Sequence, residues 1–225
     1  MKTIIKQIKI IFMLTSSLMV LLSCDEHETL DLGIHVGYVL CDDHRTMSID
    51  DYESQHATKA VAVVFAEQTA SHPTLAVMLD EISSVAYADT LGLEQGTSAS
   101  SDAFDGWTNT VALHNSHDEK TDKGSPLADQ VFCLHTFGQS DYVPSVAEMR
   151  LLVSALSKVN PVIERCGGTP LSIDSEGGGC WYWTSTEVNE DKANTAWLCS
   201  MVNGGILPTL KNERHPVRAI VALYY

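Results

Sequence analysis

Residues 145–160 carry the strongest secondary-structure pattern in the chain, and they limit the folds that the other segments can complete. Ser145 and Glu148 have the spacing of a capping box, in which each side chain bonds the backbone N–H of the other residue. The apolar residues that follow at three- and four-residue steps are Met149, Leu152, Leu156 and Val159. Such steps are typical of a helix buried along one side. Pro161 predicts the end of this helix, because a proline inside a helix removes a hydrogen bond.

Short runs rich in β-forming residues lie on both sides of this helix. They cover residues 33–41, 59–66, 74–79, 180–186, 195–202, 206–210 and 217–224. Runs of this length, bounded by turn residues, are typical of strands. Asn203-Gly204-Gly205 predicts a hairpin turn, and residues 126–137 predict a second, weaker helix. An order of strands, then helices, then strands indicates an α+β fold rather than βαβ winding.

The start of the chain has the pattern of a secretory signal. Three lysines precede an apolar run from Ile10 to Leu22, which is about 13 residues long. A bilayer-spanning helix needs roughly 20 apolar residues, so this run is too short to serve as one comfortably. The run ends in Leu21-Leu22-Ser23-Cys24, which resembles the lipobox of bacterial lipoproteins. We expect residues 1–23 to be a cleaved signal peptide and Cys24 to carry the lipid. The alternative is an ordinary signal with an incidental cysteine.

The lipid on Cys24 would hold the protein on a membrane, because two or three acyl chains anchor a protein firmly. Residues 24–32 form a short acidic tether. Acidic residues directly after the lipid cysteine resemble the surface-export signal of Bacteroidota-type lipoproteins, although a solvated linker has the same composition. These features predict a lipid-anchored protein of the outer membrane, exposed at the cell surface.

The chain is strongly acidic, with 14 basic and 29 acidic residues and a net charge of −15. Some of the basic residues would leave with the signal peptide, so the remainder is more acidic still. Nucleic acid and anionic lipid headgroups repel such a chain, and both are excluded as partners. Hydrophobic residues make up 44% of the sequence, which is ordinary for a globular protein. We expect residues 33–225 to form a single domain.

Neither the cysteines nor the histidines form a familiar catalytic or metal-binding motif. With Cys24 acylated, the cysteines that remain are Cys41, Cys133, Cys166, Cys180 and Cys199. At most two disulfides can form among them, and their spacing does not determine the pairing. His114 and His117 lie in a polar loop, and neither G-x-S-x-G nor H-E-x-x-H occurs. We predict no enzyme activity, no catalytic residue, no metal ligand and no cofactor.

Short motifs follow one another in a distinctive order through the second half of the chain. They are Asp105-Gly106-Trp107-Thr108-Asn109-Thr110, Asp141 to Met149, Tyr182-Trp183-Thr184-Ser185-Thr186-Glu187, Ala196-Trp197, Gly204-Gly205 and Val217-Arg218-Ala219-Ile220. Together they resemble the C-type-lectin-like domain of bacterial surface lipoproteins. The resemblance implies two helices packed on a twisted antiparallel sheet, with N-terminal strands in residues 33–90 and a lectin-like core in about 100–225. Formylglycine-generating oxidases share this fold and use a cysteine pair. Cys180 and Cys199 lie in the comparable tail, but without the surrounding motif, so an oxidase is less favoured.

The resemblance also implies structural roles for residues of the tail. Trp183 and Trp197 would lie in the core, as aromatic residues in alternating strands usually do. Glu187 and Arg218 would pair inside the fold. Lys211 to Glu213 would lie in an exposed loop.

Ligand binding, by the same resemblance, would use the loops of the tail strands, residues 188–194 and 201–213. The polar positions there that would contact a ligand are Asn189, Asn194, Asn203 and Asn212. Retroelements diversify this stretch in some related proteins. The alternative is that these asparagines are turn residues. Glu187-Val188-Asn189 lacks the proline of the calcium-dependent animal lectins, and their W-N-D motif is absent, so calcium-mediated sugar binding has little support.

These expectations describe a membrane-anchored surface lipoprotein that acts as an adhesin-like binding module, with an unidentified glycan or protein as its ligand. The alternative is a structural or assembly subunit of a surface fibre or envelope complex, because the N-terminal strands offer an edge for strand addition.

Overall fold

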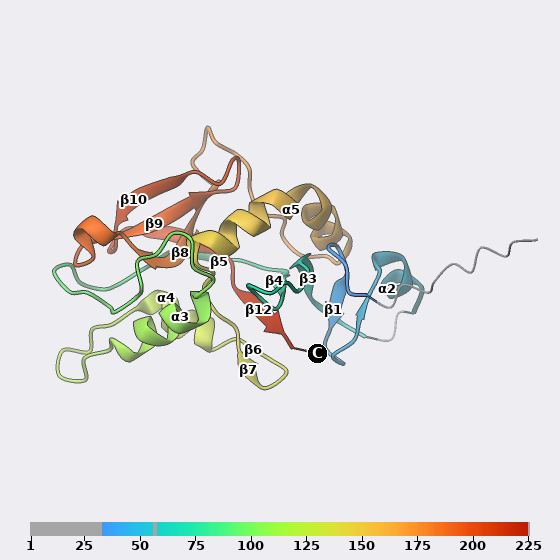
Figure 1. The fold of residues 1–225 in the computed structure, drawn as a ribbon, viewed down its shortest axis with the longest axis horizontal. Coiled ribbons are helices and arrows are strands. Elements are labelled where there is room, and N and C mark those ends of the chain that lie inside the picture. Colours follow the sequence, from blue (N-terminus) through green and yellow to red (C-terminus); the bar gives the residue numbers. More distant parts are fainter. Residues whose placement is uncertain (1–32, 56–57, 225) are drawn as a thin grey trace, which may run out of the picture. The chain divides into compact units, whose positions relative to one another are not determined.

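Five antiparallel strands from both ends of the chain form the largest sheet (Figure 1). We describe residues 33–55 and 58–224 of a computed structural model. The strands of this sheet are β1 (Val39–Cys41), β2 (Thr46–Met47), β3 (Ala60–Ala66), β4 (Thr74–Met78) and β12 (Ile220–Leu223). They lie in the order β12-β4-β3-β1-β2. The last strand of the chain therefore pairs with β4, and its other edge faces away from the sheet.

The predicted signal peptide, Cys24 and the acidic tether of residues 24–32 lie outside the described residues. Contacts along the chain group residues 34–225 into one compact unit. Within residues 33–55 and 58–224, no helix has both the length and the apolar character needed to cross a membrane.

Strand β3 lies at the centre of the five-stranded sheet and is almost wholly buried. Val63 and Phe65 belong to the main core cluster, which also contains the buried side of helix α5 (Val146–Arg165). Ala62 and Val64 belong to a smaller apolar cluster. Alternate residues of β3 thus serve two clusters, which explains why its sequence is a continuous apolar run rather than an alternating one.

Helix α5 confirms the strongest prediction from the sequence at its start and corrects it at its end. The capping box of Ser145 and Glu148 is present, with the Ser145 N–H donating to Glu148 Oε2 at 2.7 Å. Pro161 does not end the helix, which continues to Arg165. Pro161 is exposed, whereas Val162 and Ile163 are buried in the main core. Burial of these two side chains favours the extra turn, and water can satisfy the carbonyl that loses its partner.

The tail of the chain forms a three-stranded antiparallel sheet in the order β10-β9-β8. Its strands are β8 (Trp181–Glu187), β9 (Thr195–Ser200) and β10 (Ile206–Leu210). The predicted hairpin turn joins β9 to β10, and Gly204 adopts a φ of +71° there. Three of the predicted strands are thereby confirmed close to their expected positions.

The final predicted strand, residues 217–224, is divided between two sheets. Strand β11 (Arg214–Val217) pairs with β5 (Ile82–Ala86), whereas β12 pairs with β4. Arg218 lies between them and is fully buried. Its guanidinium group donates to the carbonyls of Leu79 (2.6 Å) and Thr169 (2.6 Å), so the side chain anchors the point where the backbone changes sheet.

Three further helices and a small hairpin complete the described residues. They are α2 (Ile49–Gln55), α3 (Gly106–Asn115), α4 (Pro126–Phe132) and the hairpin of β6 (His135–Thr136) and β7 (Gln139–Ser140). The predicted helix over 126–137 ends at Phe132, and the residues beyond it form the hairpin, with Phe137 (φ +58°) and Gly138 (φ +78°) at its turn. The α+β prediction is confirmed, but the described residues form four α-helices and several sheets where two helices on one sheet were expected.

Candidate ligand-binding pocket

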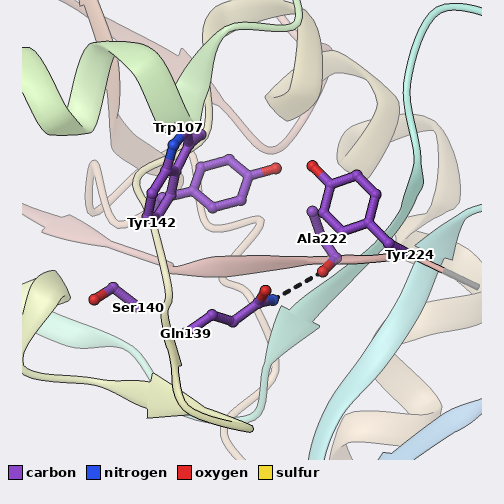
Figure 2. Close-up of a pocket in the computed structure, with 6 residues that line it drawn as sticks. All are labelled: Trp107, Gln139, Ser140, Tyr142, Ala222 and Tyr224. Atoms are coloured by element: carbon purple, nitrogen blue, oxygen red, sulfur yellow. Dashed lines mark hydrogen bonds between the residues drawn. The ribbon is translucent and has the colours of Figure 1, made fainter.

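A pocket of about 240 Å³ opens between the start of α3, the β6–β7 hairpin and the end of β12 (Figure 2). The side chains that line it are Trp107, Gln139, Ser140, Tyr142, Ala222 and Tyr224. Three of the six are aromatic and none carries a formal charge. Such a lining, largely aromatic with a few polar groups, is typical of small-molecule sites.

Trp107 stands in the first turn of α3 and is 46% exposed. Its ring meets the Tyr142 ring edge-to-face, with centroids 6.1 Å apart and an interplanar angle of 86°. Gly106 makes this placement possible. A Cβ at that position would lie 2.2 Å from Glu148 Oε2 and 2.7 Å from the Val143 carbonyl oxygen. Only glycine lets the helix start come so close to the capping box of α5.

Tyr142 is held from both its backbone and its side chain. Its backbone exchanges two hydrogen bonds of 3.0 Å with Ile220, at the start of β12. Its hydroxyl donates to Glu148 Oε1 at 3.2 Å. Burial raises the pKa of Tyr142 far above its usual range, and the nearby Glu148 carboxylate acts in the same direction. The phenol therefore stays protonated and remains a donor to Glu148.

Glu148 is buried, and its carboxyl group lies next to the pocket wall because it accepts the hydrogen bond of Tyr142. Burial raises the pKa of Glu148 to about 7. The hydrogen bonds from Ser145 and Tyr142 oppose this shift, and Asp105 adds to it. The capping carboxylate of α5 thus titrates close to neutral pH.

The polar side chains of the pocket are largely engaged within the protein. Gln139 Nε2 donates to the Ala222 carbonyl at 2.9 Å, along the outer edge of β12. Ser140 Oγ lies 3.2 Å from His135 Nδ1. Tyr224 is 78% exposed, and Figure 2 shows its hydroxyl pointing toward that of Tyr142.

A second pocket of about 220 Å³ adjoins the first, because Gln139, Ala222 and Tyr224 line both. His44 and Phe137 form part of its wall, with their rings stacked at a centroid distance of 3.8 Å. The two pockets therefore lie side by side along the edge of β12.

In comparisons with known proteins, no protein-family model matches the chain, and no curated sequence is significantly similar to it.

The asparagines predicted to bind a ligand lie elsewhere, at the two ends of the tail sheet. Asn189 is exposed in a short 3-10 turn (Asn189–Asp191), and Asn212 is exposed after β10. Asn194 lies near Asn212, because its carbonyl accepts from the Lys211 N–H. Asn203 lies at the opposite end of the β9–β10 hairpin. Strands rise about 3.4 Å per residue, so Asn203 is roughly 20 Å from the others.

Two of these asparagines accept hydrogen bonds from backbone N–H groups: Asn194 from a distant loop, and Asn203 in the pattern of a turn residue. Asn194 Oδ1 accepts from the Gly92 N–H at 3.0 Å, and its Nδ2 donates to Asp191 at 2.7 Å. Asn203 Oδ1 accepts from the Gly205 N–H at 2.9 Å. The asparagines do not form one surface and do not line the aromatic pocket. Their role in ligand binding stays a prediction.

A buried ion pair corrects two predictions about the tail. Lys211 was expected in an exposed loop, but it is fully buried, and its Nζ lies 2.5 Å from Glu187 Oε1. Glu187 therefore pairs with Lys211 and not with Arg218. Glu187 also accepts from the N–H groups of Gln95 (2.7 Å) and Thr97 (3.1 Å). The loop before α3 folds over this pair, and its backbone supplies donors that the sequence pattern does not reveal.

The tail tryptophans behave differently from each other. Trp183 is fully buried, as predicted, and its Nε1 donates to the Val85 carbonyl at 2.9 Å. Trp197 is only half-buried, because it lies on the outer side of β9.

The cysteines and histidines of the described residues do not assemble into a reactive centre. The thiols of Cys41, Cys133, Cys166, Cys180 and Cys199 are all free. Burial raises the thiol pKa of both Cys166 and Cys199 to about 11. Across residues 33–55 and 58–224, no group of three or more His, Cys, Asp or Glu side chains is placed to hold a metal ion.

Two of the six lining residues, Trp107 and Tyr142, lie in the sequence motifs, and those motifs do not indicate a pocket. Trp107 stands in the first turn of α3, Tyr142 precedes α5, and Tyr224 stands near the end of the chain. Their separation in sequence hides their proximity. An exposed tryptophan at the first turn of a helix is the one local signal that could have directed attention there.

Proposed function

We propose that this chain is a lipid-anchored surface protein with a C-type-lectin-like fold, which binds an extracellular ligand in the pocket of Trp107, Tyr142 and Tyr224. The observation that carries the proposal is an open pocket lined by exposed aromatic side chains. Soluble proteins rarely leave large aromatic rings clustered in water without a binding role.

Two further features support a binding role. The predicted lipid at Cys24 would keep the protein at the membrane, where an extracellular ligand can reach it. The hydrogen bonds of Tyr142 to Glu148 and of Gln139 to Ala222 hold two lining side chains in place. A pocket that is already organised loses less entropy when a ligand binds.

The tail loops provide a second candidate surface within the same function. Asn189 and Asn212 are exposed at one end of the tail sheet. Exposed loops held by a rigid sheet are common binding elements. This surface and the aromatic pocket use different residues, so single variants distinguish them.

The test is ligand capture by the full-length protein, purified from membranes in an uncharged detergent and applied to glycan arrays and to whole cells. We expect Trp107→Ala and Tyr224→Ala to reduce capture at least tenfold, and Phe104→Ala, an exposed aromatic outside the pocket, to leave it unchanged. Loss of capture in Asn189→Ala or Asn212→Ala, with Trp107→Ala unaffected, would transfer the site to the tail loops. Absence of any ligand would count against a binding function.

The alternative, a subunit of a surface fibre, has less support. At one side of the main sheet, β2 is an edge strand of two residues, which offers little backbone for strand addition. At the other side, Tyr142 and the Gln139 side chain occupy positions along β12.

A further inference from the structure

The aromatic pocket offers a ligand two exposed aromatic side chains beside polar ones. Trp107 and Tyr224 are the exposed rings, whereas Tyr142 is 4% exposed and its hydroxyl points toward that of Tyr224 (Figure 2). The face of an aromatic ring is electron-rich, and it attracts cations as well as apolar groups. The ring faces are therefore the main binding resource of this pocket.

Three polar side chains of the pocket already have partners within the protein. The Tyr142 hydroxyl donates to Glu148, Gln139 Nε2 donates to the Ala222 carbonyl, and Ser140 Oγ is within hydrogen-bond distance of His135. A ligand that depends on many hydrogen bonds, such as a sugar, would compete with some of these contacts. A ligand that needs none would leave them intact.

The charges around the pocket favour a cation. Among the described residues, the six that line the pocket include no lysine or arginine to hold a carboxylate or phosphate. The whole chain carries a net charge of −15, which concentrates cations near its surface. Behind Tyr142 lies the Glu148 carboxyl group, whose bond orients the phenol oxygen.

The size of the pocket restricts the ligand further. Its volume of about 240 Å³ is below the roughly 300–1,000 Å³ of sites that enclose a drug-sized molecule. It suits a compact head group whose remainder extends into the adjoining pocket or into solvent.

We infer that the pocket binds a quaternary ammonium group, of the kind carried by choline. This inference rests on the proposed binding function and names the class of ligand. A trimethylammonium group has a positive charge spread over methyl groups, is weakly hydrated and donates no conventional hydrogen bond. It matches exposed aromatic faces in an acidic protein, which is how such groups are generally recognised. A primary ammonium ion is more strongly hydrated, so removing its water for contact with aromatic rings costs more free energy.

The decisive experiment compares choline with dimethylbutanol, its neutral analogue in which a carbon atom replaces the charged nitrogen. Both are titrated into the full-length protein in an uncharged detergent, with calorimetry and tryptophan fluorescence as readouts. We expect choline to bind at least tenfold more tightly than the analogue. Equal binding would show that only apolar contact matters and would overturn the inference.

Variants locate the site. Trp107→Ala and Tyr224→Ala should each weaken choline binding about tenfold, Trp107→Phe should weaken it less because a ring face remains, and Phe104→Ala should have no effect. Circular dichroism confirms that each variant is folded, and Tyr224→Ala is the safer variant because Tyr224 is the most exposed of the rings. Unchanged choline binding in Trp107→Ala and Tyr224→Ala would overturn the assignment of the site.

Two further experiments identify the source of the quaternary ammonium group and distinguish this inference from the proposed function. Phosphocholine in solution and vesicles of phosphatidylcholine distinguish a free ligand from a lipid headgroup, and binding to either is expected. One outcome would overturn this inference and leave the proposed function standing. In it, choline does not bind, whereas a sugar binds the wild-type protein and loses that binding in Trp107→Ala. Failure of all ligands in all assays would remove both.

Discussion

Glu148 shows how a single side chain connects the fold to the pocket. Its carboxyl group caps helix α5 by accepting a hydrogen bond from the Ser145 N–H, and it accepts another from the Tyr142 hydroxyl. The same group leaves no room for a side chain at Gly106. Burial places its pKa at about 7, above the ordinary value of 4.5. Because the folded state retains this proton more readily than the unfolded state, Glu148 makes stability fall as pH rises from 4.5 to about 7.

Glu148→Gln is expected to flatten the pH dependence of stability in that window. The neutral amide keeps an acceptor for Ser145 and has no charge to bury. Each unit of pKa shift corresponds to about 1.4 kcal/mol, so the variant should gain on the order of 1–3 kcal/mol relative to wild type above neutral pH. Urea unfolding at several pH values measures this difference. Burial also raises the pKa of Asp141, to about 6. The variant should therefore keep a smaller decrease of stability with rising pH, which comes from Asp141.

Glu164→Gln on the exposed side of the same helix is the control for this variant and should retain the wild-type slope. If the stability of Glu148→Gln falls between pH 4.5 and 7 as steeply as that of wild type, Glu148 is not the source of the pH dependence.

The buried pair of Lys211 and Glu187 leads to a second prediction at the scale of the residue. Lys211→Met removes the cation and leaves the buried Glu187 side chain without its ion-pair partner. We expect a loss of about 3–5 kcal/mol in the free energy of unfolding. The double variant Lys211→Met/Glu187→Gln should lose less than Lys211→Met alone, because no uncompensated charge remains. Urea unfolding of both, with Asn212→Ala as an exposed neighbour control, checks this order.

At the scale of the element, helix α5 depends on its first turn. Ser145 Oγ accepts from the Glu148 N–H and donates to the Ala103 carbonyl at 2.8 Å. The cap therefore connects α5 to the loop that leads into α3 and Trp107. One side chain thus links the first turn of α5 to the segment that carries a wall of the pocket.

Ser145→Ala is expected to destabilise the protein by about 1–2 kcal/mol, the usual cost of losing a helix cap. Ser154→Ala in the exposed middle of the same helix should be neutral or slightly stabilising, because alanine has the higher helix propensity. Midpoints of urea unfolding give both values. A Ser145→Ala variant as stable as wild type would mean that the cap is dispensable.

At the scale of the whole molecule, the predictions concern where the binding pocket is presented. Cys24→Ser should move the full-length protein from the membrane fraction to the soluble fraction, because the lipid is the expected anchor. Immunoblots of the two fractions measure this shift. Protease added to intact cells should digest the wild-type protein if it faces outward. Protection from protease in intact cells, with digestion after lysis, would exclude an adhesin.

Local patterns predicted the parts of this protein whose structure depends on neighbouring residues. The capping box of α5, the hairpin turn at Gly204 and the central strand β3 follow from spacing and composition, since their stabilising contacts begin within a few residues. The end of α5 did not follow from Pro161. Packing of Val162 and Ile163 in the core outweighs one lost hydrogen bond there, and that packing involves distant strands.

The α+β class and the main strands were thus readable from the amino-acid sequence, and so was the expectation of a lipid at Cys24. Tertiary structure alone decided the pairing of Lys211 with Glu187, the change of sheet at Arg218 and the meeting of Trp107, Tyr142 and Tyr224 around one pocket. The physical reason is the same in each case. A buried charge selects whichever partners the fold brings to it, and a pocket assembled from three distant segments leaves no periodic pattern along the chain.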